Sequence, residues 1–160
     1  MLTAAMRTES GRPLVWSLLA SVYEYEGKQR LADRLLVGAA RRFPKSAEIR
    51  LDRVELAAES ESWDKVLGLA KRIEKELRAK RIIWKASRRE EDFYLLYARA
   101  ALCCDGTKEE LSVLGRALSA LPESQQILAA TATAIARSRL KMRRLKTKSK
   151  LARHPRGSSD

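Results

Sequence analysis

The sequence predicts an all-α protein built from stacked pairs of antiparallel helices. Two blocks between Trp16 and Pro44 place large apolar residues and alanines at the spacing of one helical face, and Gly27 separates the blocks. Pro44 is expected to stop the second helix, because proline has no N–H to donate. Alanine is abundant and aromatic residues make up only 6% of the chain, as close packing of helices requires. The 160 residues should form one domain with its own core.

The first helix pair carries the pattern most clearly. Pro13 suits the first turn of a helix, which we expect to run to about residue 26, with its partner at about 28–43. Residues 1–12 are expected to form a flexible leader. The residues that should meet between the two helices are Trp16, Leu19, Ala20, Tyr23, Ala32, Leu36 and Ala39.

This spacing resembles the tetratricopeptide repeat (TPR), a helix–turn–helix unit of about 34 residues with the pattern W-x2-L-G-x2-Y…A-x3-F…P. Ala20 stands for the glycine of that pattern and Leu36 for the phenylalanine. The resemblance implies a right-handed α-solenoid whose work is to bind another protein. Its parts would be three TPR-like helix pairs at 13–46, 47–84 and 91–122, a C-terminal capping helix at 123–144, and a basic disordered tail at 145–160.

The second pair departs from the repeat. Ser46 is a plausible N-cap, but Arg50 and Arg53 stand where the repeat has its Trp and Leu. Either this helix is rotated, or the arginines lie over its edge with their stems packed. Burying an unpaired guanidinium is costly, so we favour the rotation. The residues that would then face inward are Ile49, Val54 and Ala57.

Ten extra residues lie between the second and third pairs. Pro44 and Pro122 are 78 residues apart, whereas two repeats of about 34 residues would separate them by about 68. The simplest account is a second helix lengthened through about Trp84 and followed by a basic turn. Ile82, Ile83 and Trp84 could pack in the core, which we favour, or form an exposed docking or self-association surface.

The third pair and the cap follow from similar signals. Gly106 can take the left-handed geometry of the turn between the helices of the pair. Glu110 falls where a small residue is expected, although Leu111 could serve with a shift of one residue. The capping helix should cover the third pair with Ile127, Leu128, Ala134 and Ile135.

No catalytic constellation is visible, so an enzyme is the least favoured class. There is no glycine-rich phosphate loop and no G-x-S-x-G motif, and the single histidine is His154. We therefore expect no cofactor and no metal. Cys103 and Cys104 are adjacent on a predicted helix and are expected to be small buried residues in a reducing cytoplasm. The charged run at 71–76 is expected to be a solvated face, and no signal peptide is visible.

Positive charge is concentrated near the C-terminus. Of the net charge of +13, residues 137–156 contribute ten Lys or Arg and no acid, which leaves 23 basic and 19 acidic residues, or +4, across 1–136. This segment could bind nucleic acid by counterion release, lie on an anionic membrane, or only solubilise the chain. The candidate residues are Arg137, Arg139, Lys141, Arg143, Arg144, Lys146, Lys148 and Lys150.

The first helices of stacked pairs line a concave groove, which suits a peptide or a helical segment. The predicted function is therefore that of a protein–protein interaction adaptor, with a small TPR secretion chaperone as the alternative. The groove could instead be a solvated face or be filled by another segment of this chain. Self-association is a further hypothesis. The predicted groove residues are Ser17, Ser21, Glu24, Leu51, Glu55, Ala58, Leu95, Arg99 and Leu102.

Overall fold

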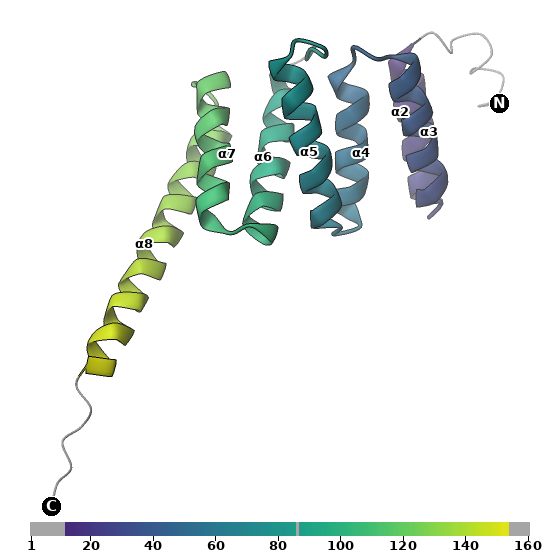
Figure 1. Cartoon of the computed structure of the whole chain (residues 1–160). Coiled ribbons are helices and arrows are strands. Elements are labelled where there is room, and N and C mark those ends of the chain that lie inside the picture. The colour runs from purple at the N-terminus through teal and green to yellow at the C-terminus, as the bar shows by residue number, and fades with distance from the viewer. Residues whose placement is uncertain (1–11, 86, 154–160) are drawn as a thin grey trace, which may run out of the picture.

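The computed structural model describes residues 12–85 and 87–153, and this part of the chain is all-α (Figure 1). Each helix packs against the next one along the chain. No helix among the described residues is long and apolar enough to cross a membrane. The seven helices of this part are α2 (Pro13–Tyr25), α3 (Gln29–Arg42), α4 (Ala47–Glu59), α5 (Trp63–Arg78), α6 (Ser87–Cys104), α7 (Thr107–Ala120) and α8 (Gln125–Arg153).

The helices form two layers. In one layer α4 contacts both α2 and α6, and α6 contacts α8. In the other layer, among the described residues, no Cα atom of α3 lies within 8 Å of α5, and none of α5 within 8 Å of α7. The α2, α4, α6 and α8 layer is therefore the more tightly spaced of the two (Figure 1).

The first pair agrees with its prediction to within two residues at each end. Gly27 has a φ of +73° and ends α2 in a left-handed turn, in which the N–H of Lys28 donates to the carbonyl of Tyr23 at 2.7 Å. Between the helices, Leu36 is 2% exposed and Ala39 is fully buried. Proline and glycine at the ends, and alanine at the contact, account for this local structure.

The rotation of the second pair's first helix is confirmed. Ile49 and Val54 are fully buried, and Ser46 caps α4 by accepting a hydrogen bond from the N–H of Ile49 at 3.4 Å. The two arginines of this helix lie at its edges and reach to neighbouring helices. Their ion pairs are Arg50–Glu76 and Arg53–Asp33, both at 3.0 Å.

The predicted extension of the next helix through Trp84 is wrong, because α5 ends at Arg78. Lys80 has a φ of +54° and occupies the left-handed position that glycine usually takes at a helix C-terminus. The N–H of Arg81 donates to the carbonyl of Glu76 at 2.9 Å, which completes this capping motif. A lysine here gives no sequence signal for a helix end.

The segment after α5 forms turns and bends instead of a helix. Ile83 forms an isolated parallel β-bridge with Ser46, in which the N–H of Ile83 donates to the carbonyl of Lys45 at 3.2 Å. Ile82 is 1% exposed and Trp84 packs on Phe93, whereas Ile83 is 58% exposed. The apolar cluster predicted here is therefore divided between the core and the surface.

The C-terminal helix only partly matches the predicted cap. Ile127 and Ala134 are buried as predicted, but Leu128 and Ile135 are 48% and 39% exposed, so their predicted covering role is wrong. The helix also continues to Arg153, past the predicted end at residue 144, because Lys, Arg and Leu favour helix. Helix at 145–153 contradicts the disorder that was predicted for this part of the tail. Residues 1–11 of the expected leader and 154–160 of the expected tail lie outside the described residues.

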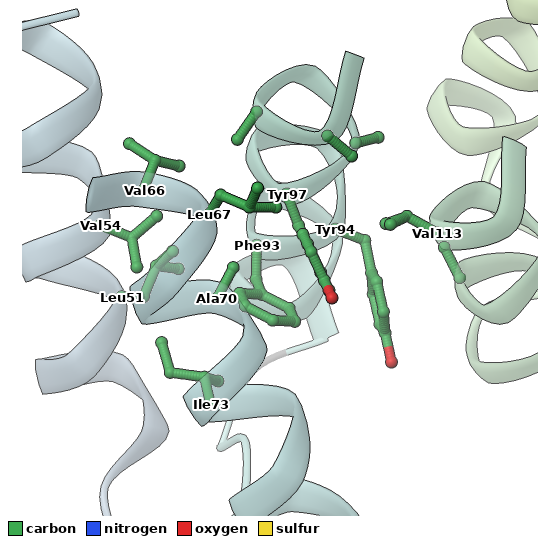
Figure 2. Close-up of a cluster of buried hydrophobic side chains, with 14 of the residues drawn as sticks. Leu51, Val54, Val66, Leu67, Ala70, Ile73, Phe93, Tyr94, Tyr97 and Val113 are labelled. Atoms are coloured by element: carbon green, nitrogen blue, oxygen red, sulfur yellow. The ribbon is translucent and has the colours of Figure 1, made fainter. Parts of the chain in front are cut away.

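The main core lies between α4, α5, α6 and α7. The ring of Phe93 is fully buried, with its centroid 5.1 Å from that of Tyr94 and 5.8 Å from that of Tyr97. Figure 2 shows Leu51 and Ile73 pointing into the same cluster. Small alanines on α6 and α7 allow these helices to approach closely.

Two carboxylates are buried: one was expected to be solvated, and the other stands where the repeat pattern has a small residue. Glu74 lies in the charged run predicted to be solvated, yet it is 9% exposed and accepts a hydrogen bond from Nε of Arg116 at 2.6 Å. Glu110 is 7% exposed and accepts two from Arg137. In contrast, Cys103 and Cys104 are exposed free thiols, so their predicted burial is wrong. They lie at the end of α6, where the chain turns away from the core.

Candidate functional site

A groove of about 830 Å³ opens on the α2, α4 and α6 layer, and we name it the acidic groove. Its apolar surface includes Ala20, Leu36, Leu56 and Leu96. Its volume is within the range of ligand-binding pockets. The acidic residues that line it come from α2, α4, α6 and the turn after α4, and they are Glu24, Asp52, Glu55, Glu59, Glu61 and Asp92.

Most of the predicted groove residues meet in this groove. Leu51 is the clear exception: it is fully buried, and its predicted place on the groove surface is wrong (Figure 2). The rotation of α4 that buries Val54 also turns Leu51 inward, because the two residues lie three positions apart on one helical face. Leu102 is half-buried and does not line the groove. The predicted residues that do line it are Ser17, Ser21, Glu24, Glu55, Ala58, Leu95 and Arg99.

The acidic character of the groove was not predicted, although the sequence carries a signal for it. Asp52, Glu55 and Glu59 are spaced by three and four residues, which places them on one face of α4. Projecting acids as well as apolar residues onto the helix would have revealed this stripe. Trp63 was also missed, and its ring packs against the guanidinium of Arg99, whose Cζ lies 4.7 Å from the ring centroid.

Two of the groove acids are held by an arginine from α6. Arg89 donates to Asp52 at 2.5 Å and to Glu55 at 2.6 Å. Ser17 on α2 also donates to Asp52, at 2.5 Å. Burial raises the pKa of both carboxyls. The hydrogen bond from Ser17 is the main cause that opposes this rise at Asp52, followed by the charge and hydrogen bond of Arg89, and Arg89 also opposes the rise at Glu55. This cluster connects α2, α4 and α6 across the groove.

Glu24 lies in a different electrostatic environment. A hydrogen bond with the Glu59 carboxyl is the main cause that raises the pKa of Glu24 to about 7, followed by burial and by the charges of Glu59, Glu55 and Asp52. Its Oε1 is enclosed and has no hydrogen-bond partner among the described residues. Four groove acids form no ion pair within 4.0 Å in the described part of the chain: Glu24, Glu59, Glu61 and Asp92.

Arg137 has a different role from the other predicted basic residues. Arg137 holds α8 to α7, since its Nη1 donates to both carboxylate oxygens of Glu110 at 2.8 and 2.9 Å. Lys148 and Lys150 continue the same helix. The basic side chains that are exposed along its C-terminal half are Arg139, Lys141, Arg143, Arg144 and Lys146.

The acidic groove offers apolar contact and negative charge, which suit non-covalent binding. Among the residues that the structure describes, no three His, Cys, Asp or Glu side chains are grouped so as to hold a metal ion. Comparison of the chain with protein-family models and with curated proteins returned no match. The geometry of the groove is therefore the basis for a functional proposal.

Proposed function

We propose that this chain is a protein–protein interaction adaptor that binds a peptide or helical segment of another protein in the acidic groove. The observation that carries the proposal is the lining of one groove by three alternate helices, α2, α4 and α6, with both apolar and charged side chains. Extended and helical peptides are held by this combination of an apolar floor and polar walls.

We further propose that the helices form a right-handed α-solenoid of three TPR-like pairs with α8 as the cap. The close spacing of α2, α4, α6 and α8, compared with the α3, α5 and α7 layer, supports a stack that curves around the groove. Burial at most of the repeat's characteristic positions also supports it. These buried positions are Leu19, Ala20, Ala32, Leu36 and Ala39.

The proposal is tested by blocking the groove. Ser21 is an exposed groove residue whose hydroxyl donates to the carbonyl four residues earlier, at 3.2 Å. Ser21→Trp should fill the groove and abolish capture of a protein partner from a lysate. The lysate should contain reductant, because Cys103 and Cys104 are free and exposed, which suits a cytoplasmic location.

A matched control is available on α7. Ser119 is also exposed and donates to the carbonyl four residues earlier, at 3.1 Å, but it lies outside the groove. Ser119→Trp should leave capture unchanged, and a photo-crosslinker should label the partner from position 21 and not from position 119. Equal loss of capture with both variants, or crosslinking only from position 119, would contradict the proposal.

The continuation of α8 favours a second candidate, an adaptor that binds nucleic acid or an anionic membrane through its C-terminal half. The exposed basic side chains of this helix lie along one continuous element instead of a loose tail. A steep fall of affinity with salt concentration, together with loss on truncation after residue 136, would support it. The Ser21→Trp variant should not affect such binding.

A further inference from the structure

The charge of the acidic groove is the reverse of the charge of the whole chain. Among the described residues, six carboxylates line it and Arg99 is the one basic side chain of the lining, whereas the chain has a net charge of +13. Arg89 compensates Asp52 and Glu55 from beside the groove. The other four acids face the groove without an ion pair to any described residue.

Glu24 and Glu59 bring two carboxyls together at the groove. A hydrogen bond with the Glu59 carboxyl is the main cause that raises the pKa of Glu24, followed by burial and by the negative charges of Glu59, Glu55 and Asp52. A cationic group that entered the groove would offset the negative charge of these carboxylates. The groove therefore suits a positively charged occupant that also has apolar side chains for the floor.

The C-terminal half of α8 has this chemistry. It carries Lys and Arg from residue 137 onward with no acid up to residue 156. Apolar residues alternate with the charges, and Leu140, Met142 and Leu145 are 57%, 55% and 53% exposed. Figure 1 shows this half of α8 continuing past the end of α7, at the opposite end of the molecule from α2. Residues 139–146 are all exposed, so no described helix covers them.

The dimensions of the two features match. Residues 137–153 of α8 form a helical segment of about 25 Å, at 1.5 Å per residue. The groove extends from α2 across α4 to α6, which is two helix-to-helix spacings of about 8–10 Å each. One helical segment of this length can therefore reach all three walls of the groove.

The groove cannot take this segment from its own chain while α8 remains helical. The buried side chains of Ile127 and Ala134 hold the first half of α8 against the preceding helices, and the Arg137–Glu110 ion pair holds its middle. The rest of the helix then leads away from the groove (Figure 1). A second copy has no such constraint.

We propose that the acidic groove of one copy binds the basic C-terminal half of α8 from a second copy. This inference rests on the proposed function of the groove as a peptide-binding surface, and it names the occupant. Each copy offers one groove and one helix, so the contact is head-to-tail and generates open chains or rings. Repulsion between the net charges of two copies is screened beyond about 8 Å at physiological salt, whereas the groove contacts are short-range.

Two charge-reversal variants test the proposal. The groove variant carries Glu59→Lys and Glu61→Lys; both sites are exposed, and Lys80 shows that lysine is accepted in the left-handed conformation of Glu61. The helix variant carries Arg139→Glu and Lys141→Glu, which are exposed on α8. Sedimentation velocity over a range of concentrations, at about 50 mM salt, measures the mass of the associated species.

The wild-type chain should gain mass with concentration, and raised salt should reverse this gain. Each variant alone should stay at the mass of one chain. An equimolar mixture of the two retains one compatible groove and one compatible helix, so it should form a species of two chains and nothing larger. A control variant, Asp105→Lys with Glu123→Lys, changes the net charge equally at exposed sites outside the groove and should associate like the wild type.

A wild-type chain that keeps the mass of one copy at every concentration would overturn the inference. So would a mixture of the two variants without a two-chain species, or a control variant that loses association. Titration of a peptide of residues 137–153 adds a separate measurement, since the groove variant should bind it about tenfold more weakly than the wild type. If the peptide and the second copy fail to bind while Ser21→Trp still abolishes capture of another protein, only this inference falls and the adaptor function stands.

Discussion

Acidic side chains have opposite roles in two parts of this molecule. Glu74, between α5, α6 and α7, accepts hydrogen bonds from Arg116, Arg78 and the hydroxyl of Tyr97. Glu24, in the acidic groove, has its side-chain hydrogen bond with another carboxyl, that of Glu59. The first arrangement satisfies a buried charge, whereas the second accumulates like charge at a surface. A carboxylate therefore contributes to the fold where cations surround it and remains available for a ligand where they do not.

Of the substitutions that test this comparison, Glu74→Ala should change the free energy of unfolding most. Glu74→Ala leaves Nε of Arg116 and the hydroxyl of Tyr97 without their acceptor, and should lower the free energy of unfolding by about 2–3 kcal/mol. Urea unfolding followed by circular dichroism measures the change. Glu76→Ala, on the same helix, removes the more exposed pair with Arg50 and should cost less than about 1 kcal/mol. Equal costs for both variants would contradict the distinction.

Arg137 should give the next largest effect. Arg137→Ala leaves the carboxylate of Glu110, which has a 9% exposed side chain, without its partner, and should lower the free energy of unfolding by about 1–2 kcal/mol. Arg139→Ala, two residues further along α8 and exposed, should change it by less than about 0.5 kcal/mol. Chemical denaturation of both variants compares them directly. Equal values would show that Arg137 is only part of the basic surface.

The smallest change in the free energy of unfolding is expected for a substitution of Glu24, and this substitution should stabilise the chain instead of destabilising it. Its pKa is about 7 in the folded chain and 4.5 ordinarily, so the folded state binds the extra proton between these values and stability falls as pH rises through them. Glu24→Gln removes this loss. It should stabilise the chain by up to about 1 kcal/mol at about pH 8, since Glu24 is partly solvated and the repulsion is screened.

Thermal unfolding at a series of pH values measures this gain. It should vanish near pH 4.5, where Glu24 of the folded wild type is protonated as well. Glu26→Gln, at an exposed site paired with Lys28, is the matched control and should show no gain at high pH. A gain for Glu24→Gln that is the same at every pH would contradict the assigned cause.

The sequence predicts well those parts of the fold in which proline or glycine marks the ends of the helices. Pro13, Gly27 and Pro44 mark the first pair, and the structure follows them closely. The end of α5 was not predicted because Lys80, and not glycine, takes the left-handed position. Backbone hydrogen bonds hold it there, and these cannot be recognised from the type of residue. The continuation of α8 was not predicted for a different reason. A segment rich in Lys and Arg can be either a disordered tail or a helix, and its composition does not distinguish the two.

The sequence predicted where the groove lies, but it only partly predicted which side chains line it. Ser17, Ser21 and Arg99 line it because the periodicity of their helices places them opposite the core. Leu51 does not line the groove because the rotation of α4 that buries Val54 also turns Leu51 into the core. The pairing of Arg89 with Asp52 joins residues 37 positions apart, and such contacts depend on how the helices stack.

The β-bridge between Ser46 and Ile83 has a consequence for synthesis of the chain. Glu48, in the first turn of α4, accepts a hydrogen bond from the N–H of Lys85 at 2.5 Å, across a separation of 37 residues. Translation at about 5–20 residues per second needs about 2–7 s to cover that distance. The backbone N–H that holds the first turn of α4 is therefore synthesised seconds after that turn.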